Sequence, residues 1–123
     1  MPSVTDQGIV GYMCDNGDNY PYFMGAMRIM TGSCSNMGQY FDLPYLADDA
    51  WLIHPGYKVI LCRAINYGGN SVTLDNSNGL YVKMFKLSTN QNHTLSFKSY
   101  YKGGLQMPDM SSPDMHTYVD GPA

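Results

Sequence analysis

Short apolar runs alternate with clusters of turn-forming residues along this chain. The most regular run, Tyr57–Ile65, is followed by a turn containing Gly68-Gly69 and then by a second run, Asn70–Leu74. This arrangement is typical of a β-hairpin. Further strands are expected at Gly8–Met13, Tyr22–Met30, Gln39–Leu43, Leu80–Leu87 and His93–Tyr101. Short strands about ten residues apart, bounded by Gly, Asn and Asp, predict an antiparallel β-sandwich or barrel.

Two features refine this pattern. Tyr22–Met30 fits either a strand or a short helix, because its aromatic and Met residues also follow helical spacing. The pair Gly11-Tyr12 recurs as Gly56-Tyr57 after 45 positions, a distance that suits one four-stranded Greek key unit. The chain therefore predicts two Greek key units in one domain.

The last twenty residues differ from the rest. Residues 104–123 include Pro108 and Pro113 and show no strand period. We expect a β domain over residues 1–103, followed by an irregular arm over residues 104–123 that is extended or disordered. Because solvated tails rarely carry many apolar side chains, Met107, Met110 and Met115 are candidates for contacts between this arm and a partner.

Composition narrows the function classes. All ten acidic residues are Asp, the net charge is −3, and the seven Lys and Arg residues look scattered. The absence of Glu argues against long exposed helices, and the lack of a basic stripe argues against nucleic-acid binding. No segment approaches the roughly 20 apolar residues of a membrane span, and no signal peptide is visible. An intracellular or virion-assembly component is favoured over a secreted protein.

Candidate catalytic groups are few. Three cysteines, Cys14, Cys34 and Cys62, form no close pair, which favours buried free thiols over a disulfide or zinc framework. No metalloprotease, serine-hydrolase or phosphate-loop motif is present. Trp51 could be a platform for a sugar, but its apolar neighbours favour a place in the core. We expect a protein that is not an enzyme.

The hairpin residues resemble a known family. Tyr67, Gly69 and Ser71 match part of the Greek key signature of the βγ-crystallins, although Cys62 stands where that signature has an aromatic residue. The resemblance covers mainly residues 51–74 and implies an all-β, βγ-crystallin-like Greek key sandwich. Gly69 would adopt a backbone conformation that is closed to residues with a Cβ atom. Tyr67 would cover the folded hairpin, and the Ser71 hydroxyl would tie it by a hydrogen bond.

The same resemblance implies calcium, because many βγ-crystallins bind it. Asp48, Asp49, Asp75 and Asn76 are the oxygen-bearing residues that could contribute, but none is followed by the hydroxyl pair of the family's calcium pattern. Calcium needs six to eight oxygen ligands. We expect no firmly bound cofactor and retain calcium as an alternative.

The composition and the missing catalytic motifs favour a structural subunit of a larger protein assembly, whether capsid-like, coat-like or of the stress-protein type. Many Met and Tyr residues suit protein–protein surfaces. Its partners would be other protein subunits, in a homo- or hetero-oligomer. The alternatives are a calcium-binding βγ-crystallin module and a secreted toxin or carbohydrate-binding domain.

Overall fold

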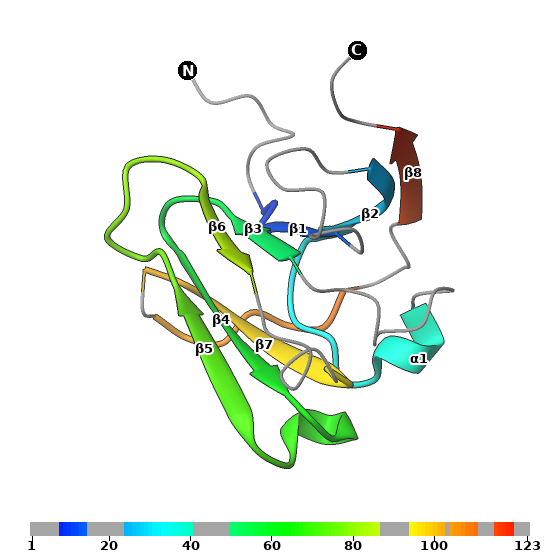
Figure 1. Ribbon diagram of the computed structural model, residues 1–123. Helices are drawn as coiled ribbons and strands as arrows, with labels where there is room; N and C mark the ends of the chain where they lie inside the picture. Colours follow the sequence, from blue (N-terminus) through cyan, green and yellow to red (C-terminus); the bar gives the residue numbers. More distant parts are fainter. Residues whose placement is uncertain are drawn as a thin grey trace.

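The computed structural model describes residues 8–14, 24–40, 50–86, 94–102, 104–110 and 115–119, and its strands form two antiparallel sheets (Figure 1). The five-stranded sheet has the order β6-β3-β1-β2-β8. Its strands are β1 (Gly11–Cys14), β2 (Met24–Met30), β3 (Ala50–Ile53), β6 (Lys83–Lys86) and β8 (Met115–Val119). The all-β prediction is confirmed, and the ambiguous stretch before residue 31 is a strand.

The second sheet contains the predicted hairpin. Its order is β5-β4-β7, with β4 at Tyr57–Cys62, β5 at Ser71–Asp75 and β7 at Ser96–Tyr101. Strand β4 alternates between buried and half-buried residues until its last two positions, so that one of its faces covers the core. This alternation is the pattern expected for a strand in a sheet with one buried face.

The two sheets exchange segments between two Greek key units. The first unit contains β1, β2, residues 33–34 and β3, and the second contains β4, β5, β6 and β7. Strand β6 belongs to the second unit by sequence but pairs with β3 of the first unit. Conversely, Cys34 of the first unit forms an isolated bridge with Phe97 in β7 of the second unit. Each unit therefore contributes its third segment to the other sheet. The two Greek keys predicted from the sequence are interlocked.

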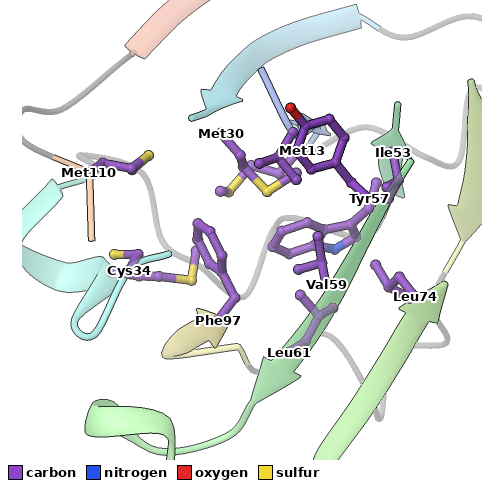
Figure 2. Packing of buried hydrophobic residues seen from close by; sticks show 13 residues of the cluster. Met13, Met30, Cys34, Ile53, Tyr57, Val59, Leu61, Leu74, Phe97 and Met110 are labelled. Atoms are coloured by element: carbon purple, nitrogen blue, oxygen red, sulfur yellow. The ribbon is translucent and has the colours of Figure 1, made fainter. Parts of the chain in front are cut away.

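A buried apolar cluster lies between the sheets (Figure 2). Its members are Val10, Met13, Met30, Cys34, Met37, Trp51, Ile53, Tyr57, Val59, Leu61, Leu74, Phe97 and Met110. Phe97 of β7 points toward Met30 of β2, and its ring lies edge-on to Trp51 of β3 at 6.1 Å between centroids. Such edge-to-face pairs are favourable beyond the area that they bury. Trp51 is fully buried, as predicted.

Two strand predictions are corrected. The strand expected at Gln39–Leu43 is wrong over residues 39–40, because α1 (Met37–Tyr40) forms a single helical turn there. The Asn36 Oδ1 atom accepts a 3.0 Å hydrogen bond from the Gly38 amide, and this side-chain cap favours a helix start. Residues 41–43 lie outside the described ranges. The strand expected from residue 80 begins only at Lys83, because residues 80–82 form an exposed loop.

The described residues after position 103 contact the rest of the domain. Strand β8 pairs with β2 along the edge of the five-stranded sheet, and Met110 belongs to the core cluster. The described parts of residues 104–123 thus contribute one strand to the sheet and one side chain to the core. Among the described residues, no helix is long and apolar enough to cross a membrane.

Candidate functional site

The hairpin between β4 and β5 folds over at three residues with positive φ. Asn66, Tyr67 and Gly69 have φ values of 57°, 63° and 74°. Glycine adopts such values without the penalty that a Cβ atom brings. The Asn66 amide donates a 2.7 Å hydrogen bond to the Ser35 carbonyl, which draws the hairpin tip toward the first unit. The conformation predicted for Gly69 and the fold-over itself are therefore present.

A buried serine on β7 pins this hairpin. The Ser96 hydroxyl donates a 2.5 Å hydrogen bond to the Ala64 carbonyl and accepts a 3.0 Å bond from the Tyr67 amide. Ser71, for which we predicted this role, lies exposed at the start of β5 and faces Cys62 across the strand pair. The pinning hydroxyl thus comes from the neighbouring strand, 29 residues away from Tyr67.

Replacing Ser96 by Ala is expected to destabilise the domain by about 2 kcal/mol, since two hydrogen bonds to buried or half-buried groups are lost. Urea unfolding followed by Trp51 fluorescence measures this loss. Ser71→Ala is the matched control and is expected to stay within about 0.5 kcal/mol of the wild type, as is usual for exposed positions. An equal loss in both variants would contradict the assignment of the pin to Ser96.

The segment 104–110 crosses from one unit to the other, and we call it the strap. The Met107 amide donates to the Ser99 carbonyl at 2.7 Å, which ties the strap to β7. The buried Ser33 hydroxyl donates to the Met107 carbonyl at 2.5 Å and accepts from the Ser99 amide at 3.0 Å. The Met110 amide donates to the Ser33 carbonyl at 2.9 Å. The strap therefore bonds to both units and holds them together.

Asp109 connects the strap to the hairpin. One of its carboxylate oxygens accepts a 3.1 Å hydrogen bond from the Ser35 amide, and the other accepts a bond from the Tyr67 hydroxyl. Partial burial raises the pKa of the Asp109 carboxyl, but the hydrogen bonds from Ser35 and Tyr67 outweigh burial and hold the pKa below its ordinary value. Burial and the bond to Asp109 raise the pKa of the Tyr67 hydroxyl.

These pKa shifts predict the pH dependence of the strap. Because the folded-state pKa of Asp109 is lowered, its stabilising contribution is present above about pH 4 and is lost as the pH falls through the folded-state value. The raised pKa of Tyr67 acts at alkaline pH. The stabilising contribution of the Tyr67 hydroxyl is present below about pH 10 and is lost as the pH rises through the folded-state pKa.

Asp109→Asn is expected to lower the free energy of unfolding by about 1 kcal/mol at neutral pH. The difference from the wild type should shrink as the pH falls, because protonation removes the same interaction from the wild type. Urea titrations between about pH 2 and 7 test this expectation. A difference that stayed constant over this range would show that the Asp109 carboxylate contributes nothing through its charge.

The methionines expected on a partner-binding arm lie on the strap and on β8. Met110 is buried, and its Sδ atom accepts a 3.4 Å hydrogen bond from the Thr31 amide. Met107 packs partly buried against the core cluster. The backbone of Met115 pairs with Arg28 in the five-stranded sheet. The described contacts of all three are therefore within the domain.

Asp75 and Asn76, the described candidates for calcium ligands, bond to neighbouring groups of the chain. One Asp75 carboxylate oxygen accepts hydrogen bonds from the Ser77 amide at 2.9 Å and the Ser77 hydroxyl at 2.6 Å. These bonds, assisted by Lys58 and Lys83, lower the pKa of Asp75. The buried Asn76 side chain donates from Nδ2 to the carbonyls of residues 53 and 81. Both residues hold the local backbone. Asp48 and Asp49 lie outside the described ranges.

The two cysteine side chains that the structure describes are buried. Cys34 and Cys62 are free and buried, and burial raises the pKa of the Cys34 thiol to about 11. A thiol with a raised pKa is a poor nucleophile at neutral pH. Within the part of the chain that the structure describes, no group of three or more His, Cys, Asp or Glu side chains could hold a metal ion.

An exposed apolar surface lies at one end of the molecule, and we call it the apolar end. It comprises Leu80 (82% exposed), Tyr81 (81%), Val82 (49%), Tyr101 (49%) and Leu105 (94%). Figure 1 shows its two segments, the loop from β5 to β6 and the chain after β7, on the same side. Both segments are anchored at one turn: the Gly56 amide donates to the Asn76 carbonyl at 2.9 Å, and the Tyr101 ring packs on Gly56.

Sequence reasoning missed the apolar end. Leu80, Tyr81 and Val82 were assigned to a strand, although three consecutive apolar residues cannot alternate between two faces of a sheet. That break in alternation, directly after a turn cluster, was the available signal. The contribution of Tyr101 and Leu105 carried no such signal, because their proximity to the loop arises from tertiary contacts.

Comparisons with known proteins agree with this architecture. A scan against protein-family models and a search of curated proteins found no match. A solved structure concerning the evolution of the eye lens βγ-crystallin domain fold matches with a TM-score of 0.58 and 15% identity, covering 77% of this chain and 87% of that chain. Likeness at this level of identity establishes the fold rather than the activity. The chain is a βγ-crystallin-like β-sandwich, as its hairpin residues predicted.

Proposed function

We propose that this chain is a non-enzymatic structural subunit that packs through its apolar end against other protein subunits. The observation that carries the proposal is the exposure of five large apolar side chains on two adjoining segments. Contiguous apolar patches of this kind on monomeric proteins are frequently interaction sites. Covering one Leu side chain contributes about 1.5–3 kcal/mol, so a partner that covered Leu80 and Leu105 would bind with substantial free energy.

The fold and the site geometry support a structural role. The βγ-crystallin-like sandwich is typical of structural domains rather than of enzymes. The carboxylate of Asp109 and the hydroxyls of Ser33 and Ser96 join parts of the chain to one another. A capsid-like or coat-like component and a stress-type structural protein are both subunits of the proposed kind.

The alternatives receive less support from the described residues. A calcium-binding module would draw on Asp75 and Asn76, but one Asp75 carboxylate oxygen already accepts bonds from Ser77, and the Asn76 amide nitrogen donates to two backbone carbonyls. A carbohydrate-binding domain would use an exposed tryptophan, whereas Trp51 is fully buried. A secreted toxin would be expected to oxidise its cysteines, whereas Cys34 and Cys62 are free thiols.

Light scattering combined with size-exclusion chromatography tests the proposal. The average mass of the wild type should rise above that of the monomer as its concentration increases, and Leu80→Ser with Leu105→Ser should weaken association at least about tenfold. Ile65→Ser is the matched control, because Ile65 is 46% exposed and lies on the hairpin, away from the apolar end. A wild type that stays monomeric at all concentrations would contradict the proposal.

A further inference from the structure

Strand β5 forms one edge of the three-stranded sheet (Figure 1). The strand at the other edge of this sheet, β7, is covered, because Cys34 forms an isolated bridge with Phe97 and Gln106 forms one with Tyr100. Within the part of the chain that the structure describes, no strand pairs with the outer side of β5. The backbone groups on that side can therefore pair with a strand from another molecule.

The hydrogen bonds next to β5 show which of its backbone groups face outward. The Asn76 amide, directly after β5, donates to the Tyr57 carbonyl at 2.9 Å. In an antiparallel pair, residues that bond to the neighbouring strand alternate with residues that do not. The even-numbered residues of β5 therefore bond to β4, whereas the amides and carbonyls of Ser71, Thr73 and Asp75 face away from it. All three of these residues are exposed.

Strand β5 lacks the features that usually keep edge strands apart. Natural edge strands often carry Lys or Pro, or are interrupted by a bulge. The segment Ser71–Asp75 contains neither Lys nor Pro, and its register with β4 runs without a bulge. By contrast, β6, which lies at one edge of the five-stranded sheet, begins with Lys83 and ends with Lys86. Nothing in the sequence of β5 opposes the addition of a strand.

A second copy of β5 matches this edge. When two copies run antiparallel with Thr73 opposite Thr73, all the outward-facing amides and carbonyls of β5 find partners. Ser71 of each copy then lies opposite Asp75 of the other, so a hydroxyl donor faces a carboxylate and the two Asp75 side chains stay apart. Both hydrogen bonds from Ser77 go to Oδ1 of Asp75, on one side of that carboxylate. The segment is therefore complementary to itself in this register.

The inner face of β5 also gains in this register. Val72 of one copy would lie opposite Leu74 of the other. Leu74 is 2% exposed, and Val72 packs partly buried against the core cluster. Apolar cross-strand pairs stabilise a sheet, and this pair would cover the remaining exposed part of Val72. The apolar face of the sheet would thus continue from one copy into the next.

We propose that two copies of this chain pair through β5, antiparallel about a two-fold axis at Thr73, so that their three-stranded sheets form one continuous sheet. This surface differs from the apolar end, so the inference goes beyond the proposed function. A five-residue pairing buries less than the roughly 800 Å² per partner of a standard interface, and we therefore expect a dissociation constant on the order of 100 μM.

Oxidative cross-linking of the full chain at about 1 mM tests the register. Thr73→Cys would place the two Cα atoms about 5.5 Å apart, within disulfide reach, and should give a covalent dimer. Ser71→Cys is the matched control, because its two copies would lie about 14 Å apart along the strands. The wild type, in which Cys34 and Cys62 are buried, accounts for the native thiols. Equal cross-linking of the two variants, or none with Thr73→Cys, would overturn the register.

Amide hydrogen exchange on the wild type tests the contact without any variant. Exchange at Thr73 should slow at least about threefold between 10 μM and 1 mM, because pairing protects an amide that is otherwise exposed. Thr73→Pro removes this outward donor without removing a bond to β4, and should weaken dimerisation at least about tenfold. Thr73→Ala keeps the donor and should change dimerisation less than about threefold.

The outcomes separate this inference from the proposed function. Exchange at Thr73 that does not depend on concentration would overturn the β5 contact and leave association through the apolar end standing. Leu80→Ser with Leu105→Ser should leave the protection of Thr73 in place, since those side chains lie outside β5. Loss of that protection in this variant would contradict an independent β5 contact.

Discussion

Asn76→Asp is expected to destabilise the domain by about 3 kcal/mol or more at neutral pH. The Asn76 side chain is 5% exposed, and its Nδ2 donates to the Ile53 carbonyl at 2.9 Å and to the Tyr81 carbonyl at 2.8 Å. An ionised Asp has no proton to donate, so it would place a buried negative charge against two carbonyl oxygens. Thermal melting should show a loss of at least about 10 °C.

The pH dependence of this variant provides a second test. Burial would raise the pKa of the introduced carboxyl above its unfolded-state value. Its neutral form, which donates one hydrogen bond, is favoured at low pH, so the variant should recover stability relative to the wild type as the pH falls. Asp75→Asn, an exposed neighbour, is the control and should cost less than about 1 kcal/mol. A variant as stable as the wild type at pH 7 would show that Asn76 is free to bind other groups.

Gly11→Ala is expected to cost about 3 kcal/mol, at the upper end of what overpacking usually costs. A Cβ atom on Gly11 would lie 2.0 Å from the Leu52 carbonyl oxygen and 3.0 Å from the Ile53 Cα atom. Both are backbone atoms of β3, which pairs with β1 in the middle of the five-stranded sheet. The two strands must separate to accept the methyl group, and chemical denaturation measures the resulting loss.

Gly68→Ala is the control for this substitution. A Cβ atom at Gly68 would meet its nearest neighbour, the Ile65 carbonyl oxygen, at 3.4 Å, and its φ of −92° suits any residue. We expect a change of less than about 1 kcal/mol. A cost at Gly68 equal to that at Gly11 would indicate that the close approach of β1 and β3 is not what requires glycine.

The hairpin could be predicted from the sequence because its determinants are local. Gly69 needs a positive φ whatever surrounds it, and the alternation of β4 marks the face that meets the core. The hydroxyl that pins the hairpin could not be assigned in this way. Ser71 matches a motif, whereas Ser96 reaches Tyr67 only because β7 lies beside β4.

The position of the strap was even harder to predict from local sequence than the pinning hydroxyl. Pro108, Pro113 and the missing strand period of residues 104–123 predicted an arm apart from the domain. Hydrogen bonds between residues 74 to 79 positions apart, such as those of Ser33 with Met107 and Thr31 with Met110, return it to the core. No local pattern encodes such pairs, because they depend on where two distant segments end after the sheets have formed.

The amino-acid sequence alone determined the all-β class, the fold-over at Gly69, and the buried Trp51 and free thiols. These properties follow from local conformation, hydrophobicity and composition. Only the tertiary structure decided which strands exchange between the units and that the Asn76 side chain bonds to the backbone of Ile53. It also placed the segments that carry Leu80–Val82 and Leu105 on the same side of the molecule, because packing brings together residues that the sequence keeps apart.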